Sequence, residues 1–442
     1  MPDHATSADP DVQRQLDRLW ALGPGADILG LDRITRLLAR IGDPHLRLPP
    51  VLHVAGTNGK GSTCAFLRAA IEATGQTAHV YSSPHLVRFN ERIRLAGSLI
   101  ADDALALLLE QVLDAGGDIG ASFFEITTAA AFLAFARTPA DACIIEVGLG
   151  GRLDATNVVP SPAACAIAQL GIDHQAFLGD TAEVIAGEKA GIAKRDVPLV
   201  TMAYAPSVAQ RIAQVAAIAG APVHARGAAW DFTVEGECLH YRDASGQVES
   251  PLPALCGPHQ AANLALAIAT LRHQQSIASN ATAFAAAATG ARWPARMQRL
   301  SPGPLTILLP PESETWLDGG HNEAAARSVS AALQEVAQGR PVHLVLGMLS
   351  NKDAQGLLAP FAPFTMSLTA VPVPGHPHHD PSDLAGIARR VGIHQTSTAQ
   401  NVEQALRALA PDLTGEVGPV VLILGSLYLA GEVLVANDER PA

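Results

Sequence analysis

The chain has 442 residues, enough for two or three domains of ordinary size. Its 30 Lys and Arg residues against 42 Asp and Glu residues give a net charge of −12, which argues against a general binder of nucleic acid or of anionic membranes. Charged residues make up only 16% of the chain, which argues against disorder. Anionic ligands would therefore have to be held by local features of a folded protein.

The sequence carries no sign of a membrane or secretory location. The longest apolar stretch without a charged residue, 155–172, contains Asn157, prolines and Gln169, so we expect no membrane-spanning helix there. The N-terminus has neither a basic region nor an apolar core, so we expect no secretory signal. The five cysteines are scattered without a Cys-x-x-Cys pair, which predicts free thiols in a reducing cytoplasm rather than disulfides or a zinc site.

In the first part of the chain, short apolar runs alternate with helical patterns. The run 51–55 predicts a strand, and a glycine-rich loop and a helix that stops at Gly75 follow it. This alternation predicts an α/β fold with a mostly parallel, doubly wound sheet. The further strands expected in this part are 78–81, 142–147, 163–169 and 198–202.

The middle and last parts of the chain follow different patterns. A hairpin insertion of short antiparallel strands is expected at about 228–253, and an Ala-rich helix at 259–273. The Pro-rich segment 291–304 is a candidate linker, after which the alternation resumes. We therefore predict two α/β domains, 1–295 and a smaller 296–442. The strands expected in the second domain are 306–309, 315–317, 342–346, 365–369 and 420–424.

The strongest local signal is the segment 56–62, which reads Gly-Thr-Asn-Gly-Lys-Gly-Ser. It follows a predicted strand and opens a predicted helix, so its backbone N–H groups and the helix N-terminus can bind phosphates. Lys60 would neutralise terminal phosphates, and Ser62 could face the phosphates or a metal ion. The spacing departs from Gly-x-x-x-x-Gly-Lys-Ser/Thr because Val54 stands at the first position, and the alternative is a plain glycine-rich turn.

Polar residues end the two strands predicted at 142–147 and 163–169. Glu146 lies at the strand edge where ligands bind to open α/β sheets, which makes it a candidate Mg²⁺ ligand. The alternative is a carboxylate that caps a loop or pairs with Arg152. His174 follows the next strand at the same edge, which leaves a metal-ligand role and a hydrogen-bonded structural role equally open.

Three other segments give weaker signals. Lys189 lies beside Glu188 in a predicted helix, and this context alone favours a surface lysine. Ser83, after the strand predicted at 78–81, is by itself a polar loop residue. The histidine-rich tract 374–380 could bind a metal, but its prolines favour an extended, exposed loop.

Motifs spread along the chain in a fixed order carry the most specific signal. They are DILGLDRI (27–34), HVAGTNGKGSTC (53–64), YSSPHLVRFNERIR (81–94), FFEITTAAAF (123–132), IIEVGLGGRLDATN (144–157), GIDH…EKAGI (171–192), WPARMQ (293–298), LDGGHN (317–322), LGMLSNKD (346–353) and LGSLY (424–428). In this order they resemble the folylpolyglutamate synthase/dihydrofolate synthase family of the Mur-ligase superfamily. The sequence departs from the usual family pattern at 175–176 and at 320–323.

The resemblance implies a P-loop ATPase domain, a smaller Rossmann-like C-terminal domain and an ATP-dependent ligation. ATP phosphorylates a carboxylate of a pteroate or folate, and the amino group of L-glutamate attacks the acyl phosphate. Because two anions must meet, metal ions and a lysine have to screen their charge. The implied cofactors are two Mg²⁺ ions, with ATP as co-substrate.

The resemblance also assigns roles to residues. The implied metal ligands, with Lys189 as a carbamate, are Ser83, Glu146, His174 and Lys189, and the last three with Lys60 are the implied catalytic residues. The implied nucleotide contacts are Gly59, Lys60, Gly61, Ser62, Asn263, Arg296 and Asp318. The implied pterin-site residues are Leu29, Ser122, Phe123, Phe124, Glu125, Leu153, Asp154 and Ala155. The positions implied near glutamate are His321 and Ser426.

We therefore expect a cytoplasmic, monomeric, bifunctional enzyme that makes dihydrofolate and extends folates with glutamate, with small-molecule substrates and neither nucleic acid nor membrane partners. A folylpolyglutamate synthase without the first activity is the alternative, although the segments 27–34 and 122–125 favour a dihydropteroate site. A cell-wall Mur ligase would leave the pterin-site segments unexplained. The joint presence of Lys60, Glu146, His174 and Lys189 argues against a non-enzymatic nucleotide-binding regulator.

Overall fold

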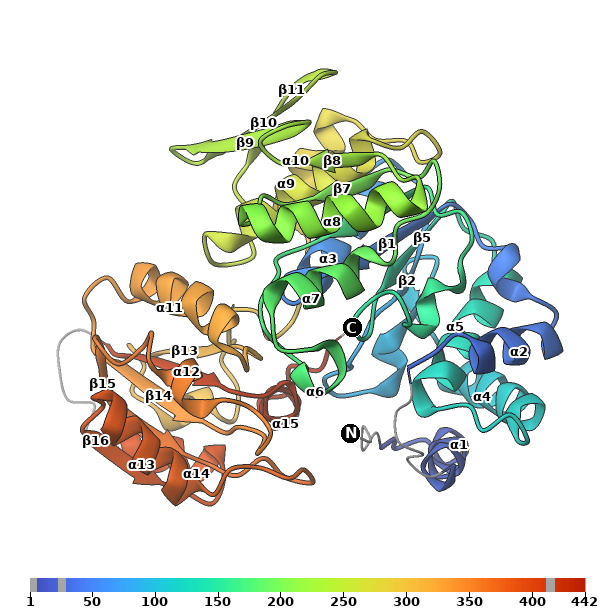
Figure 1. The fold of residues 1–442 in the computed structure, drawn as a ribbon. Coiled ribbons are helices and arrows are strands. Elements are labelled where there is room, and N and C mark those ends of the chain that lie inside the picture. Colours follow the sequence, from blue (N-terminus) through green and yellow to red (C-terminus); the bar gives the residue numbers. More distant parts are fainter. Residues whose placement is uncertain (1–5, 23–28, 411–417, 442) are drawn as a thin grey trace. The chain divides into compact units, whose positions relative to one another are not determined.

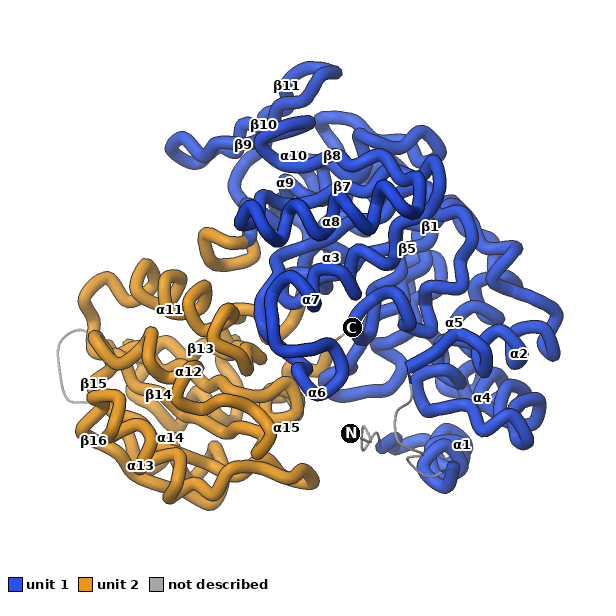
Figure 2. The backbone as a smooth tube through the Cα atoms, in the orientation of Figure 1, with its two compact units in different colours: residues 1–254, 260–292 blue, residues 255–259, 293–442 orange. Residues whose placement is uncertain are grey.

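The computed structural model divides into two compact units, which Figure 2 colours separately. The residues it describes are 6–22, 29–410 and 418–441, so Asp27 and Ile28 of the first motif lie outside them. Unit 1 comprises residues 1–254 and 260–292, and unit 2 comprises 255–259 and 293–442. Sequence analysis placed 255–259 in the first domain, whereas here Cys256 packs against the hydrophobic core of unit 2.

Unit 1 is built on an eight-stranded sheet. Its strands are β1 (Val51–Ala55), β2 (Ala78–Tyr81), β3 (Ile93–Leu95), β4 (Ser98–Leu99), β5 (Ala142–Glu146), β6 (Ala164–Ile167), β7 (Leu199–Thr201) and β8 (Val223–Ala225). The spatial order is β4-β3-β2-β5-β1-β6-β7-β8, and only the pairs β2–β3 and β3–β4 are antiparallel. Figure 1 labels β2, β5, β1, β7 and β8 of this sheet. The prediction of a mostly parallel, doubly wound sheet is therefore confirmed.

Helices cover both faces of this sheet, and for that reason every residue of β1 and β5 is buried. The helices of unit 1 are α1 (Pro10–Ala21), α2 (Asp32–Arg40), α3 (Lys60–Glu72), α4 (Asp102–Gly116), α5 (Phe123–Arg137), α6 (Gln175–Leu178), α7 (Ala182–Ala190), α8 (Pro206–Ala219), α9 (His259–Arg272) and α10 (Ala281–Gly290). One core joins α1, α2, α4 and α5 to β1, β2 and β5, and another joins α7 and α8 to β6 and β7. Helix α3 connects β1 to β2. Because crossovers between parallel strands are right-handed, α3 packs on the face of the sheet opposite to the helices of these two cores.

The segment expected to form a hairpin insertion is a three-stranded antiparallel sheet. Its strands are β9 (Trp230–Glu235), β10 (Cys238–Asp243) and β11 (Gly246–Pro251). An ion pair fastens it to α9, because Arg272 donates from Nε and Nη2 to the two carboxylate oxygens of Asp243 at 2.6 and 2.7 Å. The side chain of Asp243 is only 2% exposed.

Unit 2 is a second α/β unit with its own core. Its strands are β12 (Gln298–Arg299), β13 (Glu314–Leu317), β14 (Val342–Leu346), β15 (Thr365–Ala370), β16 (Gln395–Thr398) and β17 (Val420–Leu424), in the spatial order β12-β13-β17-β14-β15-β16. Its helices are α11 (Glu323–Ala337), α12 (Ala354–Leu358), α13 (Pro381–Val391), α14 (Val402–Leu409) and α15 (Leu427–Ala436). All strands but β12 are parallel, and α11, α12 and α13 pack on β14, β15 and β17.

One predicted strand is wrong. Residues 306–309 form a 3₁₀ turn, Thr306–Leu308, instead of a strand. Both sides of β13 are already occupied, by β12 and β17, so no sheet position next to it is left. The backbone N–H groups of Leu305 and Thr306 donate instead to the side-chain oxygen of Asn437, at 3.1 and 3.4 Å. A short apolar run alone does not distinguish these outcomes.

Membrane-spanning helices and cysteines are the next two features of the described residues. No helix in the described part of the chain is long and apolar enough to cross a membrane. All five cysteines are free, as expected. Those in the cores of the sheets are buried, whereas Cys238 of unit 1 and Cys256 of unit 2 are partly exposed.

We expect Asp243→Ala to lower the free energy of unfolding by about 3 kcal/mol, because it leaves the Arg272 guanidinium largely buried without its partner. The exposed pair of Arg407 and Glu403 in α14 provides the matched control, and Glu403→Ala should change stability by less than about 0.5 kcal/mol. Urea denaturation followed by circular dichroism measures both variants. Equally small effects of the two substitutions would contradict a structural role for the buried pair.

Candidate active site

Within the segment 56–62, residues 56–59 form a tight loop between β1 and α3, and residues 60–62 begin α3, as the sequence pattern indicates. Gly59 makes the turn into the helix with a φ of 81°, in the left-handed region that favours glycine. A Cβ atom at Gly59 would lie only 2.5 Å from Oδ1 of Asn263, which comes from α9. Gly59 therefore serves two purposes, because it turns the chain and leaves room for Asn263 against the loop.

Two lysines converge on one carbonyl of this loop. Nζ of Lys60 lies 3.1 Å from the carbonyl oxygen of Gly56, and Nζ of Lys189, from α7, lies 2.9 Å from the same oxygen. Lys189 is 5% exposed, so the alternative of a surface lysine is wrong. Burial, together with the positive charge of Lys60, lowers the pKa of Lys189 to about 7. A substantial fraction of this amine is therefore neutral, and nucleophilic, at physiological pH.

Glu146 ends β5 and is buried beside the loop that follows the neighbouring strand β2. The backbone N–H of Ser83 in that loop lies 3.4 Å from Oε2 of Glu146, so the structure brings these two predicted residues together. Arg152 pairs with Glu188 at 2.9 Å rather than with Glu146. The alternative of an ion pair between Glu146 and Arg152 is therefore wrong.

His174 lies on a loop that is anchored to the phosphate loop. The hydroxyl of Thr57 donates to the carbonyl of Gly171 at 2.9 Å and accepts from its N–H at 3.1 Å, three residues before His174. His174 itself is exposed and has a φ of 54° at the start of α6. Its role as a metal ligand stays a prediction.

Within the described ranges, no three or more His, Cys, Asp or Glu side chains form a group that could hold a metal ion. The predicted ligand set contains only two residues of those types, Glu146 and His174, so this finding bears mainly on the histidine-rich tract. There, Nδ1 of His378 lies 2.7 Å from the carbonyl of His376, and Nε2 of His379 lies 2.9 Å from the carbonyl of Lys352. These ring nitrogens bind backbone oxygens and fasten a loop.

The three segments predicted at a pterin site lie together in unit 1. Helix α5 contacts both α2, which follows Leu29, and the short turn Ala155–Val158. Ser122 caps α5, and the carboxylate of Glu125 accepts a hydrogen bond of 2.7 Å from the N–H of Ser122. Glu125 also pairs with Arg33 of α2 at 2.9 Å. Arg33 was missed as a partner, although it lies in the motif 27–34.

The loop after β5 is held by hydrogen bonds to one of its own side chains, and an aromatic ring packs against it. The carboxylate of Asp154 accepts hydrogen bonds from the N–H groups of Leu149 at 2.8 Å and Thr156 at 3.0 Å, so it fixes the path of the loop. Above the loop, the ring of Phe124 takes the space that a side chain at Gly148 would need, since a Cβ there would lie 2.3 Å from Cζ. Phe123 packs in the other direction, with its ring 5.5 Å from that of Trp20.

In unit 2 three of the four predicted residues follow the neighbouring strands β13 and β17. Asp318 follows β13, and its carboxylate accepts from the N–H groups of Met297 at 2.7 Å and Gly320 at 2.6 Å, which fixes the backbone next to Arg296. His321 lies in the same loop. Ser426 follows β17 and caps α15. The carboxyl ends of these two strands thus carry three of the four predicted residues of this unit, whereas Arg296 precedes β12.

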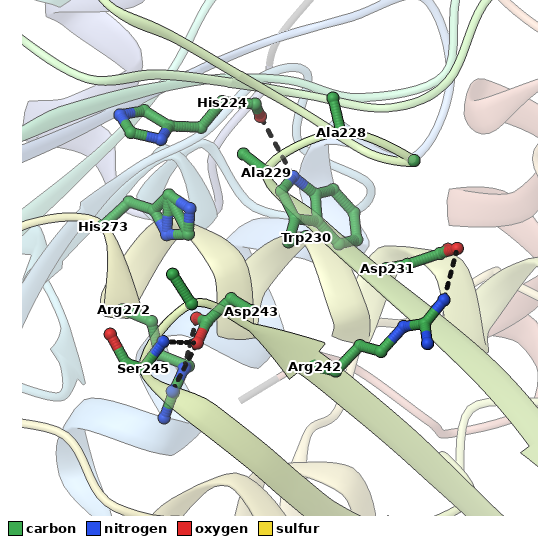
Figure 3. Close-up of a pocket in the computed structure, with 12 residues that line it drawn as sticks. His224, Ala228, Ala229, Trp230, Asp231, Arg242, Asp243, Ser245, Arg272 and His273 are labelled. Carbon is green, nitrogen blue, oxygen red and sulfur yellow. Dashed lines mark hydrogen bonds and ion pairs between the residues drawn. The ribbon is translucent and has the colours of Figure 1, made fainter.

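Figure 3 shows a pocket of about 660 Å³ in unit 1 that contains none of the predicted residues. It lies between β8, the inserted sheet and the end of α9, and the perpendicular rings of His224 and His273 are 4.3 Å apart in it. Its acidic groups are paired within the fold, Asp243 with Arg272 at 2.6 Å and Asp231 with Arg226 at 3.0 Å.

We expect Gly59→Ala to abolish nucleotide binding. The methyl group added to the phosphate loop would collide with the side chain of Asn263 from α9. Gly75, just beyond the other end of α3, provides the matched control, since it has a φ of 82° and no atom within 4 Å of its Cβ position. Both variants should lose about 1–2 kcal/mol of stability through the left-handed backbone, and only Gly59→Ala should lose affinity. Calorimetric titration with ADP measures this, and equal affinities of the two variants would refute the steric argument.

The chain is similar to known proteins along nearly its whole length. Residues 308–436 match the family described as dihydrofolate synthetase, C-terminal domain. The dihydrofolate synthase/folylpolyglutamate synthase of Escherichia coli (strain K12) is 33% identical over 414 residues, which cover 93% of this chain and 92% of that protein.

Two solved structures are similar to the whole fold. E. coli FolC in complex with DHPP and ADP has a TM-score of 0.87 at 32% identity, with 98% of this chain and 99% of that chain covered. A bifunctional folylpolyglutamate synthase/dihydrofolate synthase with Mn, AMPPNP and L-glutamate bound has a TM-score of 0.84 at 32% identity, with the same coverage.

Proposed function

The chain belongs to the dihydrofolate synthase/folylpolyglutamate synthase family, and from this membership we propose that the loop 56–62 is where ATP activates a pteroate or folate carboxylate. The enzyme is an ATP-dependent ligase that joins L-glutamate to dihydropteroate and to folates. The observation that carries the site assignment is the convergence of Lys60 and Lys189 on the carbonyl of Gly56, at 3.1 and 2.9 Å. This convergence places the amino groups of two lysines at a phosphate-binding turn, in a protein whose net charge is −12.

The reaction has two transfers. A carboxylate oxygen of the pteroate or folate attacks the γ-phosphorus of ATP, and ADP leaves. The amino group of glutamate then attacks the carbonyl carbon of the acyl phosphate, phosphate leaves, and the new amide nitrogen loses a proton. Lys60 is held over the loop by backbone carbonyls, so its ammonium group screens the charge of the phosphates without first having to be reoriented.

A divalent metal ion fits the donors at this edge of the sheet. Glu146 offers a buried carboxylate beside Ser83, and Lys189 would add two oxygens as a carbamate, which hard cations prefer to an amine. We assign two Mg²⁺ ions to Ser83, Glu146, His174 and Lys189. When bound, they supply Lewis-acid screening of the phosphate oxygens.

The remaining contacts are assigned by ligand. For the nucleotide we propose Gly59, Lys60, Gly61, Ser62, Asn263, Arg296 and Asp318. For the pterin we propose Leu29, Ser122, Phe123, Phe124, Glu125, Leu153, Asp154 and Ala155. For glutamate we propose His321 and Ser426. We further propose that the enzyme is a cytoplasmic monomer, with domains 1–295 and 296–442.

Phosphate release tests this function. With MgATP, dihydropteroate and L-glutamate, we expect phosphate and dihydrofolate in equal amounts, and with a reduced folate in place of dihydropteroate we expect glutamylated folate. Lys60→Ala should lower kcat by about 10²–10³ and controls for contaminating phosphatase. Ligation of glutamate to the folate but not to dihydropteroate would favour a folylpolyglutamate synthase without dihydrofolate synthase activity. Ligation to neither substrate would overturn the proposal.

We expect Lys189 to be carbamylated. Only the neutral amine reacts with CO₂, and a pKa of about 7 means that this form grows as the pH rises through 7. Enzyme freed of CO₂ should lose activity and regain it with bicarbonate, more completely at pH 8 than at pH 6 when dissolved CO₂ is held constant. Lys189→Ala should be inactive with or without bicarbonate.

Lys194 provides the matched control, because it is a partly buried lysine whose Nζ binds the carbonyl of Asn157 at 2.9 Å, away from the phosphate loop. Lys194→Arg should keep the bicarbonate response. Full activity of CO₂-free wild-type enzyme would contradict the carbamate.

A further inference from the structure

We propose that Gln260 is a positioning residue that fixes the side-chain amide of Asn263, and that this fixed amide makes the enzyme choose a nucleotide with an exocyclic amine on its base. The inference rests on the proposed function in one respect, that Asn263 contacts the nucleotide. It concerns Gln260, to which neither the sequence motifs nor the spacing gave a role.

The two side chains lie one turn apart on α9. Oε1 of Gln260 accepts a hydrogen bond of 3.0 Å from Nδ2 of Asn263, and both side chains are buried, Gln260 completely. On its other side, Oδ1 of Asn263 lies 2.5 Å from the Cβ position of Gly59 in the phosphate loop. The hydrogen bond to Gln260 thus holds the amide of Asn263 with its nitrogen toward Gln260, and its oxygen faces the loop.

The other end of Gln260 points to the purpose of this contact. Nε2 of Gln260 is buried and finds no hydrogen-bond partner among the residues that the structure describes. A buried donor without an acceptor destabilises a fold, and a leucine or methionine of similar volume would avoid that penalty. Packing alone therefore favours an apolar residue here. What glutamine adds is the acceptor that Oε1 presents to Asn263.

The fixed amide determines which chemical groups it can meet. Oδ1 of Asn263 can only accept a hydrogen bond, so a ligand group that meets it has to be a donor. The exocyclic amine of adenine is a donor, whereas the carbonyl of hypoxanthine at the same position is an acceptor and would be repelled. An amide free to rotate could offer Nδ2 to that carbonyl instead. Gln260 therefore sets the direction of the choice between the two bases.

Nucleotide binding to the full-length protein tests the proposal without any ligation step. We would titrate ADP and inosine diphosphate, in the presence of Mg²⁺, into wild type, Gln260→Met and Gln260→Glu. Wild type should prefer ADP by about tenfold or more, which is the usual effect of one mismatched hydrogen bond. Gln260→Met, which has no comparable acceptor, should bring the ratio close to one. Gln260→Glu should keep the preference, because a carboxylate also accepts from Nδ2.

A merely structural role predicts a different result. Gln260→Met would then weaken ADP and inosine diphosphate equally and lower Tm, and that outcome would overturn the proposal. In an Asn263→Ala background, Gln260→Met should leave the ratio unchanged, and a ratio that still changes would also overturn it. If Gln260→Met does not fold, Gln260→Asn, whose amide is too short to reach Asn263, provides the same test.

A third ligand separates the base from the ribose. Discrimination against 2′-deoxyadenosine diphosphate should be the same in wild type and Gln260→Met, and a change confined to this ligand would refute recognition of the base amine. Because these are binding measurements, their failure is distinct from a failure of the ligase function. The ligase function is judged by phosphate release in wild type.

Discussion

The site depends on two lysine side chains that share one backbone carbonyl. The Nζ atoms of Lys60 and Lys189 both lie within 3.1 Å of the carbonyl oxygen of Gly56. Lys60 and Lys189 come from α3 and α7, which lie on opposite faces of the sheet, and both reach the loop past the carboxyl end of β1. Their mutual repulsion and burial act in the same direction and lower the pKa of Lys189 to about 7. A lysine that is chemically inert on a surface thereby becomes a reactive amine beside a phosphate loop.

The same arrangement explains how a strongly acidic protein can handle substrates that are all anions. A net charge of −12 repels nucleotides and folates at long range, but salt screens that repulsion beyond about 8 Å. Within the loop, the N-terminus of α3 and the ammonium of Lys60 provide a local field of the opposite sign. Binding therefore depends on short-range geometry, and for this reason Gly59, which admits Asn263 to within contact of the loop, is sensitive to one added methyl group.

Most of the core strands could be predicted from the sequence, and the edges of the sheets could not. The buried strands β1, β14 and β17 have the bounds that their apolar runs indicate, because both faces of a parallel sheet are covered. The edge strands β4 and β16 carry no such runs, since one side of each strand is left without a neighbour, and sequence analysis missed them. The run 306–309 was misassigned because only the tertiary structure shows that both sides of β13 are taken.

The candidate site divides in a similar way. The phosphate loop and Glu146 could be located from strand-loop-helix order alone. Lys189 could not be located in this way, because Gly56, whose carbonyl it contacts, is 133 residues away in the sequence. Its neighbour Glu188 also suggested an exposed lysine. Gln260 could not be located either, because only the buried hydrogen bond to Asn263 and the unpartnered Nε2 show the importance of a glutamine one helical turn before Asn263.

The distribution of thiols has a practical consequence for spectroscopy. Each compact unit contains one partly exposed cysteine, Cys238 on the inserted sheet of unit 1 and Cys256 beside the core of unit 2. Burial raises the pKa of Cys256 to about 11, so little thiolate forms there at neutral pH and labelling is slow. At neutral pH a first maleimide dye can therefore be directed to Cys238, and a second, in excess and with a longer reaction time, to Cys256. The natural sequence thus offers a donor and an acceptor position for measuring energy transfer between the two units during turnover.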